Sequence, residues 1–502
     1  MLSTLLFMAA TYAVQAEADY SGAWRPQFHF TPEKNWMNDP NGLVWYDGEY
    51  HLFYQYNPMD KVWGHMSWGH GVSRDLVHWE HLPIALQEET EWMMFSGSAV
   101  VDTNNVTGFF SGPDSQTSGC LVCFYTAHKQ GRQTQNLAYS NDRGRTWTKY
   151  SGNPVIDIGY ADFRDPKVIW HEQSKKWVMA VALSTEKQVR FYGSKDLKQW
   201  SHLSDFGPEG SCAGPWECPD LMRFPDEQWL LQVCVGHGRE SGGSGVQYFM
   251  GRFDGTKFTN DNSTSTVFWM DHGPDFYASQ SWSDIPERDG RRISIAWMTN
   301  LEYAGNLPTD PWRGNQSVPR VLELKQAAGK YRLIQNPVEE LKLLRGQHTR
   351  FQDQTLSAAN SLLTDKNVSG DLLEVLAEFE LGTTEEAGIK LRKGADEETV
   401  VGYDALRQQM FVDRKHSGKS DFHERFATRH SAAMAPDNGK VRLHLFVDRS
   451  SVEVFGNGGE TVISALVFPS PESSAIQCYQ TGNNARLASM DVWNLKSIWK
   501  DE

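Results

Sequence analysis

Up to about residue 335 the chain alternates apolar and polar positions in short runs that are broken by Gly, Asp, Asn and Pro. Alternation with a period of two is typical of β-strands, and no long stretch carries the 3.6-residue period of an amphipathic helix. The clearest runs are residues 49–56, 176–182, 228–234 and 292–297. This pattern predicts an all-β fold.

A weak internal repeat runs through the same region. Residues 73–79, 140–147 and 194–200 each start with Ser, continue through a polar turn that contains Asp and end on Trp. Copies spaced by ~50 to 70 residues favour radial repetition, because a four-stranded propeller blade takes at least ~40 residues. A five-bladed β-propeller over residues 19–335 is therefore predicted. A large jelly roll is the alternative, but it would not need the repeated turn.

The pattern changes at residues 336–345, which predict a short amphipathic linker helix. Asn336 is the expected N-cap and Pro337 the first helical residue, since both types favour these positions. Beyond the linker, alternating runs return at hairpin spacing, which predicts a C-terminal β-sandwich over residues 346–502. Its clearest hairpin joins runs 441–447 and 451–455.

Composition restricts the class of partner. The 502 residues carry a formal net charge of -15, which argues against nucleic acid or an anionic membrane as partner, because both attract basic surfaces. A neutral substrate fits better. The 19 Trp residues also suit sugar binding, because sugar rings stack on exposed aromatic side chains, although most of these rings should belong to the core. The oligomeric state is left open.

The first residues predict secretion. Residues 2–16 form an apolar run followed by small residues, which is typical of a signal peptide, here assigned to residues 1–18. The run is too short to span a bilayer, which needs ~20 apolar residues. Four glycosylation sequons are compatible with an extracellular location, and they begin at Asn105, Asn262, Asn315 and Asn367.

The cysteine and histidine residues predict neither a disulfide framework nor a metal site. Six scattered cysteines allow at most one or two bridges in a chain of this length. Cys120 and Cys123 are spaced like a redox or zinc pair, but they lie in a strand-like run and are expected to be buried. His171-Glu172 lacks the second His of a metalloprotease helix. No cofactor is predicted.

Three acidic residues carry the candidate chemistry: Asp39, Asp165 and Glu217. Each lies in a strand-like run from a different predicted blade. Inner strands of a propeller face one axis, so the three carboxyl groups are expected to converge. Convergence requires their pKa values to separate, and glycoside hydrolysis uses that separation for an ionised nucleophile and a protonated acid. Taken singly, each motif also fits a turn or a local ion pair.

The motifs around these acids resemble those of glycoside hydrolase family 32, the invertases, inulinases and levanases. Residues 36–42, Trp-Met-Asn-Asp-Pro-Asn-Gly, resemble the family signature, and Arg-Asp-Pro at 164–166 and Trp-Glu-Cys-Pro at 216–219 follow in the family's order. Further similar runs lie at residues 53–55, 63–69, 95–98, 275–278, 296–300, 317–320 and 446–455. The resemblance covers nearly the whole predicted mature chain.

The resemblance implies a five-bladed propeller followed by a β-sandwich, and a retaining mechanism. Asp39 would attack the anomeric carbon of a fructosyl unit, and Glu217 would act as acid and then as base. Asp165 would hold ring hydroxyls, with Arg164 keeping it ionised. Retention requires the two catalytic carboxyls to lie ~5 to 5.5 Å apart. The remaining residues implied as pocket lining are Asn38, Gln55, Trp63, Phe95, Ser96, Arg164, Tyr277 and Trp297.

Two segments are treated separately. Residues 235–243 are more charged than the family pattern leads us to expect, and they are predicted to lie near the pocket rim. Asp448 belongs to a strong family motif in the sandwich, and a structural role is expected for it.

The predicted function is that of a secreted retaining exo-β-fructosidase acting on the terminal β-D-fructofuranosyl residues of levan, inulin and sucrose. Runs 63–69 and 307–314 resemble exo-acting fructanases more than plant invertases. Three alternatives stay open: an invertase with sucrose as main substrate, a fructan-binding protein without turnover, and an inverting arabinan- or xylan-degrading propeller hydrolase. The stereochemistry of the first-formed sugar separates the last of these from the prediction.

Overall fold

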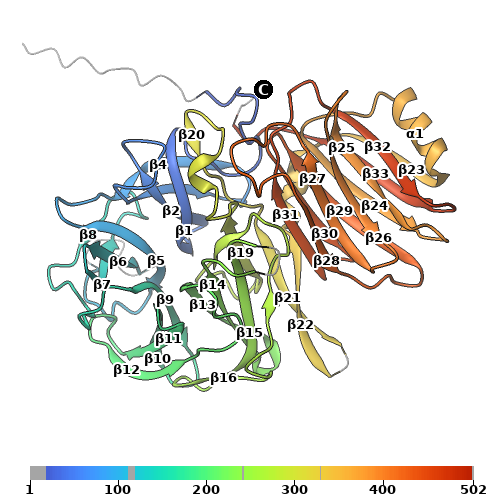
Figure 1. Cartoon of the computed structure of the whole chain (residues 1–502). Helices are drawn as coiled ribbons and strands as arrows, with labels where there is room; N and C mark the ends of the chain where they lie inside the picture. The colour runs from blue at the N-terminus through green and yellow to red at the C-terminus, as the bar shows by residue number, and fades with distance from the viewer. Residues whose placement is uncertain (1–18, 111–118, 240–241, 328, 500–502) are drawn as a thin grey trace, which may run out of the picture.

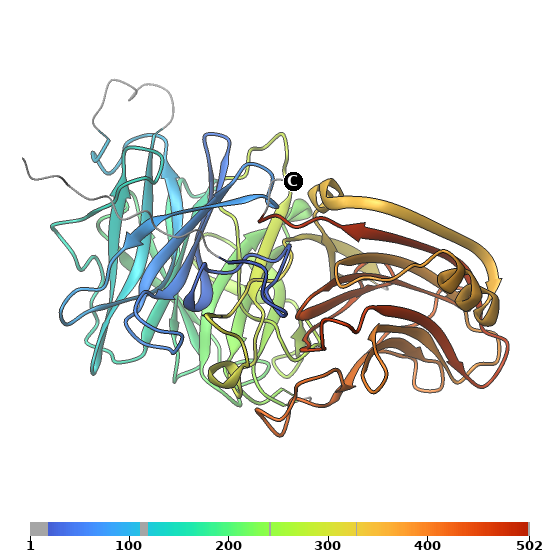
Figure 2. The ribbon, with the colours of Figure 1, turned by 90° about the horizontal axis from the view of Figure 1, so that it is seen from above.

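The computed structural model of the chain describes residues 19–110, 119–239, 242–327 and 329–499. Strands dominate both parts of the molecule, which lie side by side in Figures 1 and 2. The described helices are α1 (Leu356–Asp365) and three 3-10 helices at Pro225–Glu227, Ala304–Asn306 and Glu339–Leu344. The mainly β character predicted from the pattern is confirmed. The predicted signal peptide, residues 1–18, lies outside the described residues.

The N-terminal part consists of five sheets that follow one another along the chain. Within each sheet the neighbouring strands are antiparallel, except that β20 pairs in parallel with β1. The first sheet contains β1 (Asn35–Tyr46), β2 (Glu49–Asn57), β3 (Ser67–Ser73), β4 (Trp79–Leu86) and β20 (Trp312–Arg313), and the second contains β5 (Met93–Asp102), β6 (Cys120–Lys129), β7 (Arg132–Ser140) and β8 (Thr148–Lys149). The third sheet contains β9 (Phe163–His171), β10 (Lys176–Leu183), β11 (Gln188–Ser194) and β12 (Ser201–Phe206), and the fourth contains β13 (Trp216–Arg223), β14 (Trp229–Val235), β15 (Gly245–Phe253), β16 (Phe258–Asn260) and β17 (Phe268–Trp269). The fifth sheet contains β18 (Tyr277–Ser281), β19 (Arg292–Trp297), β21 (Arg320–Ala327) and β22 (Lys330–Pro337).

The first strands of the five sheets form a closed ring. Strand β1 contacts β5, β5 contacts β9, β9 contacts β13, β13 contacts β18, and β18 returns to β1. Figure 1 shows the sheets arranged around this centre. These strands are mostly buried along their length, so their sequences lack the clean alternation of a half-exposed strand.

The internal repeat corresponds to one turn used three times. It joins the third and fourth strands of the first three sheets, between β3 and β4, β7 and β8, and β11 and β12. In each copy the Ser hydroxyl donates to the Asp carboxylate two residues later, at 3.0 Å for Ser73, 2.8 Å for Ser140 and 3.2 Å for Ser194. The Asp then accepts backbone N–H groups further along the turn. The repeat is therefore a structural device that recurs from sheet to sheet.

Every strand of the ring carries an irregularity in its pairing. The register shifts between Met37 and Pro40 in β1, Phe95 and Gly97 in β5, Arg164 and Lys167 in β9, Glu217 and Asp220 in β13, and Tyr277 and Gln280 in β18. In three of these bulges a residue other than glycine has a positive φ: Asp165 at 66°, Cys218 at 46° and Ala278 at 52°. Because a bulge changes the direction of a side chain, the five shifts re-aim residues at one level of the ring.

The connection between the two parts differs from the predicted helix. It is a 3-10 helix at Glu339–Leu344, preceded by Val338 without a side-chain cap. Asn336 and Pro337 are not its first residues, because they pair with Val321 and Arg320 and complete strand β22. The N-cap assigned to Asn336 is therefore wrong: sheet pairing outweighs the local preference of the Asn-Pro sequence for a helix start.

The C-terminal part consists of two antiparallel sheets that enclose an apolar core. One has the order β23 (Arg345–Thr355), β33 (Arg486–Leu495), β24 (Leu373–Glu380), β29 (Lys440–Asp448), β30 (Ser451–Gly456), β31 (Thr461–Leu466). The other has the order β28 (Arg429–Ala433), β27 (Gln409–His416), β26 (Glu398–Asp404), β25 (Glu386–Lys393), β32 (Ala475–Thr481). The predicted hairpin is β29–β30, closed by the pair Asp448 and Ser451. Helix α1 starts at the cap Thr355, whose hydroxyl accepts from the Ala358 N–H at 3.2 Å.

A cluster of buried charges joins the two parts. Asp448 accepts from the backbone N–H of Gln27 at 2.9 Å and from His29 Nδ1 at 2.8 Å. The other ring nitrogen of His29 lies 3.0 Å from Glu453, which also accepts from Arg320 at 2.5 Å. Burial lowers the pKa of His29, but the two carboxylates outweigh it and raise the pKa to about 9. Asp448 therefore has the structural role expected for it.

Two further expectations concern covalent modification. All six cysteines are unpaired, and Cys120 and Cys123 are buried in β6, in agreement with their interpretation as small core residues. Among the sequons, Asn315 is only 5% exposed, so it is inaccessible to a glycosyltransferase in the folded chain. Asn105 and Asn367 are exposed.

Candidate active site

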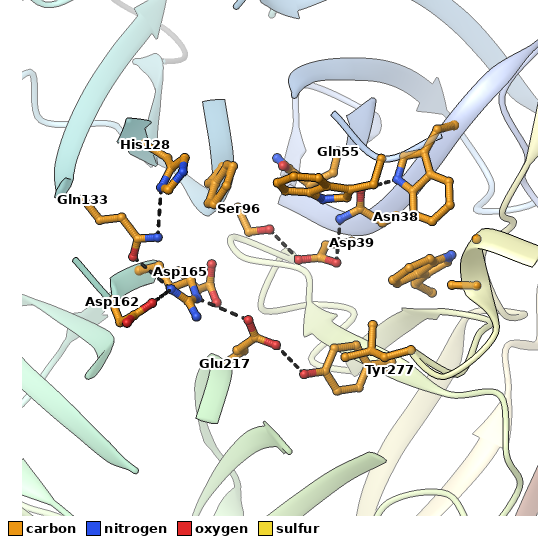
Figure 3. A pocket seen from close by; sticks show the side chains of 18 of the residues that line it. Asn38, Asp39, Gln55, Ser96, His128, Gln133, Asp162, Asp165, Glu217 and Tyr277 are labelled. Atoms are coloured by element: carbon orange, nitrogen blue, oxygen red, sulfur yellow. Dashed lines mark hydrogen bonds and ion pairs between the residues drawn. The ribbon is translucent and has the colours of Figure 1, made fainter. Parts of the chain in front are cut away.

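A cavity of about 560 Å³ opens at the bulged level of the ring (Figure 3). All eleven residues predicted for the site line it: Asn38, Asp39, Gln55, Trp63, Phe95, Ser96, Arg164, Asp165, Glu217, Tyr277 and Trp297. Residues of all five ring strands meet here, since Asp39, Ser96, Asp165, Glu217 and Tyr277 lie at or next to the bulges of β1, β5, β9, β13 and β18. The predicted convergence of three carboxyl groups is observed.

The Asp39 carboxylate is held by three donors. Ser96 Oγ donates to Oδ2 at 2.5 Å, Asn38 Nδ2 donates to Oδ1 at 2.9 Å, and the Cys218 thiol lies 3.7 Å from Oδ2. Asn38 is itself fixed by the Trp36 indole N–H, at 2.7 Å. Burial raises the pKa of Asp39 and the charge of Glu217 adds to this, while the bonds from Ser96 and Asn38 act in the opposite direction. Fixed donors orient this carboxylate toward the cavity.

Glu217 faces the same cavity from β13. Its Oε2 accepts from the Tyr277 hydroxyl at 2.5 Å, and its Oε1 accepts from Arg164 Nε at 3.2 Å. The side chain is 23% exposed, in contrast to Asp165, which is almost completely buried. Figure 3 shows Glu217 between Asp165 and Tyr277, across the cavity from Asp39. Glu217 therefore combines a fixed orientation with access from outside, as does the partly exposed Asp39.

Asp165 is the most enclosed of the three acids. Its Oδ2 accepts from the Cys218 backbone N–H at 2.9 Å, and its own N–H donates to the Thr126 hydroxyl at 3.0 Å. Burial and the charge of Glu217 raise the pKa of Asp165 to about 7, while Arg164 acts in the opposite direction. The expectation that Arg164 keeps Asp165 ionised is thus met in direction only, because burial and the neighbouring carboxylate outweigh the guanidinium.

Arg164 is the centre of a polar network that the sequence motifs did not disclose. Its guanidinium donates to Asp162 at 2.8 Å, to Gln133 at 3.0 Å and to Ser184 at 3.0 Å, besides Glu217. Gln133 in turn contacts His128, at 3.1 Å. Asp162, Gln133 and His128 also line the cavity. Asp162 lies two residues before the Arg-Asp-Pro motif, but residues 128 and 133 belong to a hairpin with no motif to mark it.

Aromatic side chains form the walls. Trp36 and Trp297 contact each other edge to face with ring centroids 5.6 Å apart, and Trp63 and Phe95 do so at 6.0 Å. Trp297 is buried and its indole N–H has no acceptor among the described residues, whereas Trp63 is 53% exposed at the mouth. Two apolar faces with a few polar groups between them suit a small polyol that must be held in one orientation.

A buried ion pair joins β9 and β13, two strands of the ring. Lys167 Nζ lies 3.2 Å from Asp220 Oδ2 and donates to the Ser281 carbonyl at 2.6 Å. The Ser281 N–H donates to the same Asp220 oxygen at 2.6 Å. Lys167 and Ser281 line a separate cavity farther along the ring, while Asp165, two residues before Lys167, lines the active-site cavity. Lys167 therefore faces the second cavity, and neither member of the pair lines the active-site cavity.

The described residues of the charged segment 235–243, which are 235–239 and 242–243, do not line the cavity. Its Arg239 is buried and donates to the backbone carbonyls of Asp271 and Gly273, on the side of the C-terminal part. For Arg239 the predicted rim position is wrong, because this arginine finds acceptors in the interface between the two parts. Residues 240–241 of the segment lie outside the described residues.

Replacing Asp165 with asparagine is expected to stabilise the fold. Folding raises the pKa of Asp165 from 3.8 to about 7, because the folded state disfavours its ionised form. The folded protein therefore loses stability as the pH rises through this interval. Asparagine cannot ionise. The melting temperature of Asp165→Asn should therefore match that of the wild type at about pH 4 and exceed it at about pH 8, with activity lost.

The comparison for this test is Asp448→Asn. The pKa of Asp448 is lowered by its hydrogen bonds with His29 although burial opposes them, so its ionised form stabilises the fold and its loss should lower the melting temperature most at neutral pH. Thermal unfolding of both variants from about pH 4 to pH 8 tests the opposite signs. A gap between Asp165→Asn and wild type that stays constant with pH would contradict the argument.

The geometry defines a class of protein. Two carboxyl groups that face one cavity, each held by its own hydrogen bonds, between aromatic walls are typical of a glycoside hydrolase. Comparison with known proteins agrees. Residues 29–337 match the glycosyl hydrolases family 32 N-terminal domain, and residues 340–494 match the glycosyl hydrolases family 32 C-terminal domain. The chain belongs to glycosyl hydrolase family 32 and is a glycoside hydrolase.

Relatives resemble the chain over almost its full length. It is 48% identical to a levanase of Bacillus subtilis (strain 168) over 99% of this chain and 74% of that protein. It is 40% identical to an extracellular exo-inulinase of Aspergillus awamori, over 99% of this chain and 98% of that protein. The crystal structure of exo-inulinase from Aspergillus awamori superposes with a TM-score of 0.87 at 38% identity, covering 96% of this chain and 100% of that one. Across the described residues, no helix has the length and apolar character needed to cross a bilayer.

Proposed function

We propose that the chain is a retaining exo-β-fructosidase that hydrolyses the terminal β-D-fructofuranosyl residues of fructans and sucrose. The observation that carries this proposal is that Asp39 and Glu217 face each other across one cavity, each held by its own hydrogen-bond donors. Relatives named levanase, exo-inulinase and invertase support the substrate class.

In the first step Asp39 attacks the anomeric carbon of the bound fructosyl unit. Glu217 gives its proton to the glycosidic oxygen, so that the bond to the leaving group breaks and a fructosyl ester forms on Asp39. In the second step Glu217 takes a proton from water, which attacks the same carbon and releases Asp39. Two inversions leave the product with the configuration of the substrate.

The other side chains position the sugar and stabilise the developing positive charge. Asp165, in the bulge of β9, accepts hydrogen bonds from ring hydroxyls, and the negative charge of its ionised form stabilises the oxocarbenium-like transition state. Arg164 and Tyr277 hold Glu217 by its two oxygens, which fixes the direction of proton transfer. The amides of Asn38 and Gln55 supply donors for a neutral polyol.

Exo attack is supported by the relatives described as exo-inulinases. In this mode one terminal unit fills the cavity, and the remainder of the substrate stays outside the mouth.

We further propose that the five sheets are the blades of a β-propeller and the two C-terminal sheets a β-sandwich. The closed cycle of contacts between the first strands supports the propeller. Strand β22 ends at Pro337, so we take the boundary there rather than at the expected residue 335, and the two family matches support it. Secretion after removal of residues 1–18 is supported by the relatives described as extracellular.

The test is product analysis of the purified protein on sucrose, inulin and levan. Fructose as the only product from both polymers is expected, and NMR within the first turnovers should detect the β-anomer before mutarotation. Oligosaccharides as products would replace exo with endo attack. The α-anomer as first product would favour an inverting hydrolase, and the lack of turnover on all three substrates would favour a binding protein.

A further inference from the structure

The loop that leads into β18 is folded against the C-terminal part. Residues 271–276 run along β31, the last strand of its sheet, on the side of the C-terminal part that faces the five sheets (Figure 1). The His272 N–H donates to the Val462 carbonyl at 2.8 Å, and the Asp275 N–H donates to the Ser464 carbonyl at 3.2 Å. The outer edge of the C-terminal sheet therefore supplies hydrogen-bond partners for the backbone of this loop.

The loop and the strand fit closely. A Cβ atom at Gly273 would lie 2.0 Å from the Ser464 carbonyl oxygen, so a larger residue would displace the strand. The strand also donates to the loop. The Ser464 N–H donates to the Asp271 carboxylate at 3.0 Å, and the Leu466 N–H donates to the Asp275 carboxylate at 2.8 Å. The C-terminal part therefore sets the position of the loop.

Asp275 of this loop belongs to a buried triad with Tyr303 and Arg414 of β27. Arg414 Nη1 donates to Asp275 Oδ2 at 2.6 Å, and the Tyr303 hydroxyl donates to Asp275 Oδ1 at 2.5 Å. Arg414 Nη2 donates to the Tyr303 oxygen at 2.9 Å, and its Nε donates to the Phe426 carbonyl at 2.6 Å. Because a guanidinium is planar and its donors point in fixed directions, Arg414 fixes Asp275 relative to β27.

The loop delivers the side chain that holds the acid of the active site. Tyr277 follows Asp275 by two residues, and its hydroxyl donates to Glu217 Oε2 at 2.5 Å (Figure 3). Phe276, between the two, is completely buried, and Ala278 on the other side of Tyr277 has a positive φ of 52°. A backbone confined on both sides cannot absorb a displacement of Asp275, so Tyr277 would move with it.

We infer that Arg414 is a positioning residue for the general acid and base Glu217. Acting through Asp275 and Tyr277, it fixes the direction in which the acid gives its proton to the leaving group. The inference rests on the proposed function and adds a residue of the C-terminal part to those that serve it. Arg414 does not line the cavity, so it acts on the reaction only through other side chains.

Two variants weaken the triad to different degrees. Arg414→Lys keeps a positive charge next to Asp275 but loses the second arm that reaches Tyr303, and Tyr303→Phe removes the hydroxyl while the ion pair stays. The matched control is Asp448→Asn, which weakens the other buried cluster between the two parts, around His29. Each protein is assayed on sucrose and on a nitrophenyl fructoside, whose leaving group needs no proton.

On sucrose kcat/KM should fall about 10-fold in Arg414→Lys and about 3-fold in Tyr303→Phe, because a misdirected acid protonates the leaving oxygen less well. On the nitrophenyl fructoside both variants should stay within about 2-fold of the wild type, since ester formation from this substrate does not use the proton. Asp448→Asn should lower the melting temperature and leave the ratio of the two kcat/KM values unchanged.

Equal losses on the two substrates would overturn the inference, because a purely structural role of Arg414 lowers both values alike. Unchanged kinetics on sucrose in both variants would overturn it as well. Tyr303→Phe keeps the buried ion pair and therefore decides the question if Arg414→Lys does not fold. A wild-type protein that turns over neither substrate would refute the proposed function, and the inference with it.

Discussion

Asp39→Asn should lower kcat on sucrose and fructans by on the order of 10⁴-fold or more, because asparagine keeps the shape of the side chain but cannot form the fructosyl ester. The fold should not suffer. Burial raises the pKa of Asp39, so its ionised form costs stability. Asn38 can still donate to the amide oxygen in the Oδ1 position, and the Ser96 hydroxyl can turn to accept from the NH2 group in the Oδ2 position. Steady-state rates together with thermal unfolding separate lost chemistry from lost structure.

Asp162→Asn is the control for this variant. Asp162 lines the same cavity and pairs with Arg164 at 2.8 Å, but it has no covalent role in the proposed mechanism. Its loss should cost far less activity than that of Asp39. An Asp39→Asn protein that keeps a tenth of the wild-type kcat would remove Asp39 from the role of nucleophile.

Glu217→Ala is expected to lower kcat on sucrose by about 10²- to 10⁴-fold, the usual contribution of a general acid and base. The loss should depend on the leaving group. A fructoside whose leaving group needs no proton should still transfer its fructosyl unit to Asp39, so that a burst of leaving group precedes a slow steady state. Stopped-flow measurement with such a substrate checks this expectation.

Azide distinguishes the two carboxylates further. In Glu217→Ala an added azide ion can enter the space of the missing carboxylate and attack the fructosyl ester, giving a fructosyl azide with retained configuration. In Asp39→Ala the azide would attack the substrate directly and give the inverted product. Products of the same configuration from the two variants would contradict the assignment of roles.

The sequence allowed the residues of the site to be predicted far better than the geometry that aims them. Asp39, Asp165 and Glu217 lie in short, unusual motifs, and the period of the strands was sufficient to expect that they converge. The bulges could not be predicted, because a register shift depends on which residues of the neighbouring strand are opposite. In β1, for example, Asn38 and Asp39 together face Gln55 of β2.

Residues outside motifs escaped prediction for a related reason. His128 and Gln133 flank the β6–β7 hairpin and reach the cavity only because the second sheet lies beside the third, where Gln133 meets Arg164. Nothing in the hairpin sequence encodes that neighbour. The helix start at Asn336 failed in the same way, since a local preference was overruled by pairing with β21.

The buried cluster of His29, Arg320, Asp448 and Glu453 sets a limit on how this enzyme can be divided. His29 and Arg320 belong to the catalytic part, and Asp448 and Glu453 belong to the C-terminal sheets. Each part alone would therefore carry charges that have lost the opposite charges of the other part. Losing one partner of a buried ion pair typically costs about 3 to 5 kcal/mol, a large share of the stability of a domain. Truncation near residue 340 will therefore leave the catalytic part without its partner charges and should not yield folded enzyme. The exchange of C-terminal parts between family members should yield folded enzyme only when both halves of the cluster are transplanted together.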